Sequence, residues 1–173
     1  MADPTYKTYV GTGAVVTADF KGVKWVGKTK GGKSVEIALT NAINRENPNL
    51  TFTEKDDVVQ TLTFEACYAN TDATANTTAE PWSIKIEDTP TAGASEILLG
   101  VGIFYIGETA VALCRGGGSF TVEREYREQN ADGDRGAVKD RIVMESSRAK
   151  LTMNALTWIT KVTSIWPAVE QQV

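Results

Sequence analysis

A run of alternating charged and apolar residues, SFTVEREYRE from Ser119 to Glu128, most limits how this chain can fold. Its period of two is that of a β-strand, but it carries too many charges for a strand buried in a core. Three glycines precede it at 116–118, turn-forming residues follow at 132–136, and a second charged stretch leads into an alternation that ends at Ala155. We therefore predict a long hairpin arm that stands off a β core. Such an arm needs a surface to lie against, and we expect that surface to belong to another copy of the chain.

Period-two alternation predicts further strands across the rest of the chain. The expected segments are Gly22–Leu39 with a turn at Gly31-Gly32, Leu50–Glu54, Gln60–Tyr68, Trp82–Ile86, and Ile97–Leu113 as two buried strands with a turn at Gly107-Glu108. Loops are expected at 41–49 and 70–79, and a linker at 89–95. Helical spacing of apolar residues, with Thr157 as a candidate N-cap and Pro167 as a stop, predicts one helix over Thr157–Glu170.

These patterns predict one domain over residues 1–173 of the mainly β class. Its core is expected to be a β-sandwich or barrel-like arrangement of antiparallel strands, with one short α-helix and the charged hairpin arm. A chain of 173 residues is long enough to bury a sizeable core of this kind.

Composition argues against several function classes. The chain has no histidine, so it lacks the commonest general base and the commonest transition-metal ligand. Its formal net charge is -4, which does not favour a protein that binds nucleic acid through phosphates.

Cys67 and Cys114 lie in segments of apolar alternation and are expected to be buried thiols. We expect no cofactor and no metal. We also expect no signal peptide and no membrane span, because neither has a matching apolar run.

Three local motifs imitate catalytic or binding sites. Gly27–Ser34 fits the phosphate-loop pattern GxxxxGK[ST], but the residues after Ser34 alternate like a strand, and a phosphate cradle needs a helix there. Asp132-Gly133-Asp134 lacks the spacing of a calcium loop and is interpreted as a turn. Glu123 and Glu125 are expected to share an open strand face, where no pocket would separate their pKa values. None of the three predicts an enzyme.

The glycine- and charge-rich runs carry a family resemblance. RGGGSFTVEREYR at 115–127, ADGDRG at 131–136 and AKLTMNAL at 149–156 resemble the major tail proteins of long-tailed bacteriophages. The hairpin at 23–33, NAIN at 41–44 and the segment ending IWPA at 165–168 fit the same pattern. The resemblance covers most of the chain. The two halves stand in reversed order relative to that family, which suggests a circular permutation with the original termini joined at 89–95.

The resemblance implies a structural virion protein, made in a bacterial cytoplasm and located in the virion tail. Copies would form hexameric rings that stack into a tube and contact other tail proteins, while DNA passes along the lumen without specific binding. Heterologous contacts of one chain with the next close into such rings. The arm residues expected at the subunit interface are Glu123, Arg124, Glu125, Arg127, Asp132, Asp134 and Arg135. We expect reversal of charge at Arg124 and Arg127 together to impair assembly more than folding.

Two alternatives stay open from the residues alone. A monomeric decoration or adhesion module of a virion would bind through the polar loop Asn70–Ala79. A nucleotide-dependent enzyme would use Gly27–Ser34 and would lose ATP binding on Lys33→Ala.

Overall fold

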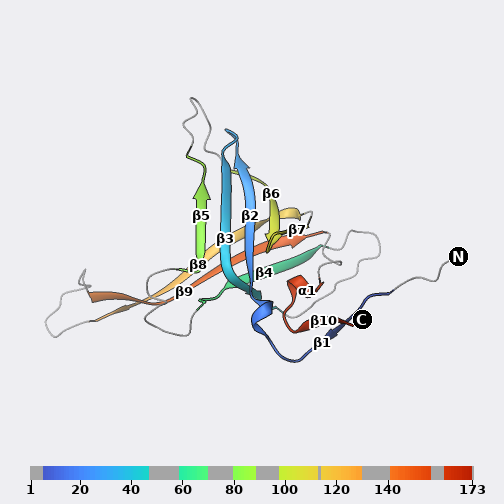
Figure 1. Cartoon of the computed structure of the whole chain (residues 1–173). Coiled ribbons are helices and arrows are strands. Elements are labelled where there is room, and N and C mark those ends of the chain that lie inside the picture. Colours follow the sequence, from blue (N-terminus) through green and yellow to red (C-terminus); the bar gives the residue numbers. More distant parts are fainter. Residues whose placement is uncertain are drawn as a thin grey trace.

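The computed structural model describes residues 6–46, 59–69, 80–88, 98–112, 114–129, 141–156 and 162–172, and it is mainly antiparallel β, as predicted (Figure 1). Within these ranges eight strands form one sheet, in the order β7-β6-β2-β3-β4-β9-β8, with β5 paired to β3 beside this path. Their bounds are β2 (Lys21–Thr29), β3 (Ser34–Asn44), β4 (Gln60–Ala66), β5 (Trp82–Ile86), β6 (Leu98–Ile106), β7 (Thr109–Ala112), β8 (Cys114–Glu128) and β9 (Ile142–Ala155).

The predicted tight turns are confirmed. Between β2 and β3, Gly32 has a φ of 88°, and the chain reverses through a hydrogen bond from the Thr29 amide to the Lys33 carbonyl at 2.9 Å. Gly107, with a φ of 60°, makes the turn between β6 and β7. Glycine reaches such angles without the steric penalty that a Cβ brings. Because β3 begins at Ser34, the phosphate-loop pattern lies in a strand–turn–strand segment with no helix behind it.

Strand β3 connects two layers of the sheet and continues to Asn44, so the loop predicted at 41–49 is wrong over 41–44, and residues 47–49 lie outside the described ranges. Its first part pairs with β2 and β5, up to Leu39, whereas Ala42–Asn44 pair with β4, and Ala42 also pairs with Lys21 of β2 beyond a register shift. Between these parts Asn41 has a φ of 50°, and its carbonyl accepts a hydrogen bond from the Cys67 amide at 3.2 Å. Ala42, Ile43 and Asn44 are all buried, so the alternation that marks a strand is lost at this bend.

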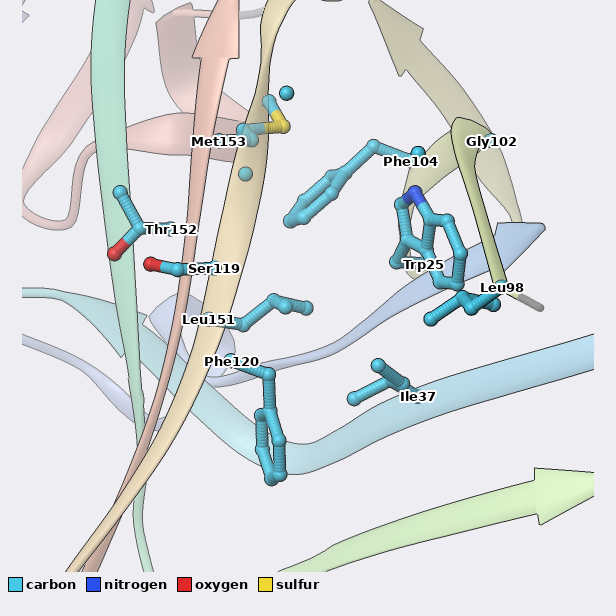
Figure 2. A pocket seen from close by; sticks show the side chains of 13 residues that line it. Trp25, Ile37, Leu98, Gly102, Phe104, Ser119, Phe120, Leu151, Thr152 and Met153 are labelled. Carbon is cyan, nitrogen blue, oxygen red and sulfur yellow. The ribbon is translucent and has the colours of Figure 1, made fainter.

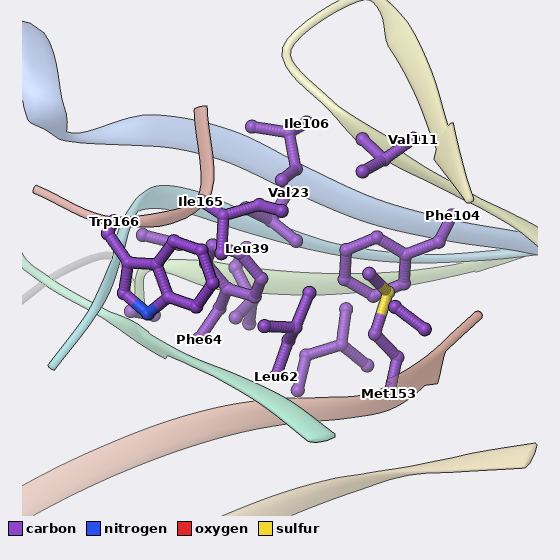
Figure 3. Close-up of a cluster of buried hydrophobic side chains, with 14 of the residues drawn as sticks. Val23, Leu39, Leu62, Phe64, Phe104, Ile106, Val111, Met153, Ile165 and Trp166 are labelled. Carbon is purple, nitrogen blue, oxygen red and sulfur yellow. The ribbon is translucent and has the colours of Figure 1, made fainter. Parts of the chain in front are cut away.

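The core lies between the two layers that the bend brings face to face (Figure 3). One layer contributes Val23, Leu39 and Phe104 from β2, β3 and β6, and the other contributes residues of β4 and β9, including Leu62, Phe64, Leu151 and Met153. Phe64 and Phe104 meet across the core with ring centroids 5.9 Å apart. The inner face of β4 consists of Leu62, Phe64 and Ala66, which are all buried.

The C-terminal segment differs from the predicted helix. Helix α1 spans Val162–Ile165, and the chain then forms strand β10 (Val169–Gln172), which pairs with β1 (Thr8–Gly11). Pro167 provides no amide hydrogen for a longer helix, and Ala168 has a φ of 55° that turns the backbone away from it. Residues 157–161, with the candidate cap, lie outside the described ranges. Ile165 and Trp166 are buried, as their helical spacing predicted.

The pairing of β1 with β10 places the two ends of the described chain side by side (Figure 1). Adjacent ends are a condition for a circular permutation, which itself stays a prediction. A 3-10 turn, Thr17–Asp19, anchors this region, because the Asp19 carboxylate accepts hydrogen bonds from the amides of Val16 and Ala168 at 2.9 and 3.2 Å. The strand expected at 50–54, the loop at 70–79 and the linker at 89–95 lie outside the described residues.

Candidate intersubunit surface on the hairpin arm

The predicted arm is formed by β8 and β9, whose pairing begins at Cys114 opposite Ala155 and runs along the arm from Ser119 opposite Thr152 to Glu128 opposite Ile142. Its base lies against the body, where Ala149 and Leu151 are buried and Phe120 packs on the core. Its outer half extends away from the body as a two-stranded ribbon (Figure 1). A two-stranded ribbon by itself is marginally stable in water, so the outer half needs further contacts to be held in place.

Charged side chains on the outer face of the arm pair with each other across the two strands. Glu123 bonds to Lys150 at 3.1 Å, and Arg127 bonds to Glu145 at 2.7 Å. The hydroxyl of Ser146 donates to Glu125 at 2.9 Å. The predicted common face of Glu123 and Glu125 is therefore confirmed, and Arg127 lies on the same face. Exposed pairs of this kind contribute little to stability, and they leave the outer face with its charges balanced.

Arg124, on the opposite face, makes its ion pair with the body. Its guanidinium bonds to the carboxylate of Glu80 at 3.1 Å and lies over the Trp82 ring, 5.9 Å from the centroid. Ser147 on β9 donates to the other carboxylate oxygen at 2.8 Å, and the Trp82 indole N–H donates to that same oxygen. Trp82 in turn packs on Phe120 with ring centroids 5.6 Å apart. Glu80 thus ties both strands of the arm to the start of β5.

The remaining predicted interface residues, Asp132, Asp134 and Arg135, lie outside the described residues. The sequence did not indicate Glu80, because a carboxylate between a polar loop and a proline carries no local signal of its distant partners.

The ion pair of Arg124 also changes the expected effect of the double charge reversal at Arg124 and Arg127. A glutamate at 124 would face Glu80 within the same chain, so this substitution would weaken the attachment of the arm as well as any contact with a neighbour.

The Glu80 carboxylate has an altered acidity. Burial alone would raise its pKa, but the hydrogen bonds from Ser147 and Trp82 and the charge of Arg124 outweigh burial and hold the pKa below its usual value. A carboxyl whose pKa is lower in the folded state stabilises the fold above its unfolded pKa. That stabilisation is lost as the pH falls through the folded pKa, so attachment of the arm weakens in acid.

We expect Glu80→Gln to lower the free energy of unfolding by about 1–2 kcal/mol at pH 7, because several hydrogen bonds to a charged group are lost or weakened. The difference between the variant and the original protein should shrink as the pH falls below the usual carboxyl range. Urea unfolding at pH 7 and pH 3 measures both. The matched control is Glu123→Gln, whose exposed pair with Lys150 should contribute less than about 0.5 kcal/mol. Equal losses in the two variants would contradict the role assigned to Glu80.

An apolar surface on the inner face of the arm is the feature that sequence reasoning missed. Tyr126, Ile142 and Met144 are 58%, 45% and 44% exposed. The strand register changes between Glu125, opposite Ser146, and Tyr126, opposite Met144, which leaves Glu145 as the extra residue of a β-bulge. This bulge puts Met144 and Ile142 on the face of Tyr126, because an added residue reverses the direction of every side chain beyond it.

That apolar surface continues the face that packs in the body. Val122 and Phe120, two and four residues before Arg124, pack against the core from the same strand face. Along β8 this face therefore carries first the partly buried Phe120 and Val122, then Arg124 with its ion pair, and then the exposed Tyr126. We call Tyr126, Ile142 and Met144 the arm patch. No sequence rule could assign them to one face without the position of the bulge.

A pocket of about 410 Å³ opens between the two layers beside the arm (Figure 2). Trp25, Ile37, Leu98 and Phe104 line it from one layer, and Phe120, Leu151 and Met153 line it from the other. The Trp25 indole lies against Gly27 and Gly102, which are paired across β2 and β6, and a Cβ at either glycine would overlap the ring. The residues lining the pocket include no titratable side chain, so it suits apolar packing and offers no acid or base.

A second pocket, of about 640 Å³, lies near α1 and includes Asn44 and Cys67. Asn44 is buried, its carbonyl oxygen accepts from the Glu46 amide at 2.9 Å, and its amide nitrogen has no hydrogen-bond partner. Burial, with the nearby Glu65 charge, raises the pKa of the half-buried Cys67 thiol and makes it a weak nucleophile. Among the described residues, no cluster of His, Cys, Asp and Glu could hold a metal ion. No helix in these ranges is long and apolar enough to cross a membrane.

Comparison of the chain with protein-family models, with curated proteins and with solved structures gave no match.

Proposed function

We propose that this chain is a structural subunit that assembles with copies of itself into stacked rings, the tail tube of a long-tailed bacteriophage. The observation that carries the proposal is the arm, a charged ribbon that extends from the body and exposes an apolar patch on the face that continues its own core contacts. A two-stranded ribbon with an exposed apolar face gains stability from a partner surface. The family resemblance of the arm sequence supports the next subunit of a hexameric ring as that partner.

Charge also supports a conduit for DNA. A subunit with a net charge of -4 and no histidine repels phosphate and does not change its charge near neutral pH, so DNA can slide without being held. Under this proposal the chain is not an enzyme and binds no cofactor. Its place is the virion tail, with other tail proteins at the tube ends.

Negative-stain electron microscopy of the purified protein over a range of concentration and salt tests the proposal. We expect rings, or tubes of constant diameter. A protein that stays monomeric under every condition, and that binds capsid or cell-wall material through 70–79, would contradict it in favour of a decoration or adhesion module. ATP binding that is abolished by Lys33→Ala would contradict it in favour of an enzyme.

A further inference from the structure

The two layers of the fold cross, and each extends beyond the area that the other covers (Figure 1). The arm is the extension of one layer. The extension of the other is formed by β5, β3 and β2 toward the β2–β3 turn. There the inner face carries Ile84 and Ile86 of β5, which pair with Ile37 and Val35 of β3.

Along β5, as along the arm, the side chains become more exposed with distance from the place where the two layers cross. Trp82 packs on Phe120 and is half-buried, whereas Ile84 is 48% exposed and Ile86, farthest from the crossing, is 62% exposed. The three side chains share one face because they alternate along a regular strand register. We call Ile84 and Ile86 the sheet patch. Ile37, which pairs with Ile84, lines the 410 Å³ pocket, so this patch borders the pocket.

We infer that the sheet patch is the surface on which the arm patch of a second copy docks. The inference rests on the proposed function and specifies its contact: the inner face of the arm of one subunit covers the β5 end of the inner face of the next. We assign a second copy of the chain as the partner, because the arm patch is the exposed continuation of one inner face and the sheet patch is the exposed continuation of the other. Those faces already pack on each other within one chain, through Phe120 and Trp82.

Charged side chains lie at the end of each patch. Glu128 lies opposite Ile142 at the far end of the arm patch, and its side chain is exposed. The turn beyond the sheet patch carries the exposed lysines Lys28 and Lys30, and the exposed Glu87, next to Ile86, accepts a hydrogen bond there from the Ser34 amide at 3.0 Å. For a neighbour's arm that reaches toward this turn, the lysines attract Glu128 and Glu87 repels it, so charge favours a register in which Glu128 lies nearer the lysines.

The contact is heterologous, because an arm meets a sheet and neither patch meets its own copy. Each subunit then has one donor patch and one acceptor patch, so contacts propagate from chain to chain and close when the rotation allows. An isologous arm-to-arm contact would instead stop at a dimer.

Photo-cross-linking tests the inference with the full chain. Place p-benzoyl-phenylalanine at position 126, mix isotopically labelled with unlabelled subunits under the conditions that give the largest assemblies, irradiate, and identify the linked peptides by mass spectrometry. We expect linkage between chains, from position 126 to the peptide that contains β5. The matched control places the same group at position 143, opposite Arg127 and so on the other face of the arm, and should give little β5 linkage.

Ile86→Glu should reduce the interchain β5 linkage by about tenfold or more, the effect of about 1.4 kcal/mol lost at one contact. Lys85→Ala, on the opposite face of β5, should leave it unchanged. Rings that form without β5 linkage, or linkage confined to one chain, would overturn this inference and leave the tube proposal standing. A protein with neither rings nor interchain linkage would overturn both.

Discussion

Replacing Phe64 by alanine is expected to lower the free energy of unfolding by about 3–5 kcal/mol, the cost of removing a buried aromatic side chain and leaving a cavity. Phe64 is buried at the centre of the fold, where β4 pairs with both β3 and β9, and its ring lies 5.9 Å from that of Phe104. A loss of this size is a large part of the stability of a typical domain. Urea unfolding followed by tryptophan fluorescence measures it.

The control for this prediction is Tyr126→Ala on the arm. Tyr126 is largely exposed, so its removal should change the free energy of unfolding of the isolated subunit by no more than about 0.5 kcal/mol. A loss below about 1 kcal/mol for Phe64→Ala would mean that the core packing described above does not stabilise the fold.

Deleting Glu145 is expected to abolish ring and tube formation while leaving the body of the subunit folded. Removing the extra residue of the bulge restores simple alternation, and Met144 and Ile142 then turn to the charged outer face. The body should be little affected, because the deletion lies outside the buried part of β9. Electron microscopy measures assembly, and circular dichroism with thermal unfolding measures the fold.

Glu145→Ala is the matched control for the deletion. It removes the ion pair with Arg127 and keeps the residue count, so the bulge and the arm patch stay in place. We expect this variant to assemble, since exposed ion pairs contribute little. Normal rings from the deletion variant would show that the direction of the arm patch does not matter for assembly.

The arm and the turns could be predicted from sequence because they depend on neighbouring residues. Alternation with a period of two places charges on both sides of Ser119–Glu128, and this pattern predicted both the strand and its exposure. Glycines reach positive φ at Gly32 and Gly107 for reasons internal to the residue. The same local reasoning identified the phosphate-loop pattern at Gly27–Ser34 as a segment followed by a strand.

The errors arose where backbone pairing overrides local preference. Ile165 and Trp166, which stand at helical spacing near the C-terminus, are buried. However, β10 forms where the helix was expected to continue. Its partner β1 lies at the other end of the chain, so no pattern within the segment could indicate it. The bend of β3 at Asn41 was interpreted as a loop for a similar reason, because the strand that resumes there pairs with β4.

The sequence alone determined that this is a mainly β chain with a long charged hairpin, since alternation and turn residues are properties of short segments. Only the tertiary structure decided which face of that hairpin is available to a partner. One bulge residue, Glu145, sets the direction of Met144 and Ile142, and one distant carboxylate, Glu80, pairs with Arg124 within the chain. Both depend on strand register and on contacts between residues far apart in sequence, and such contacts exist only once the chain has folded.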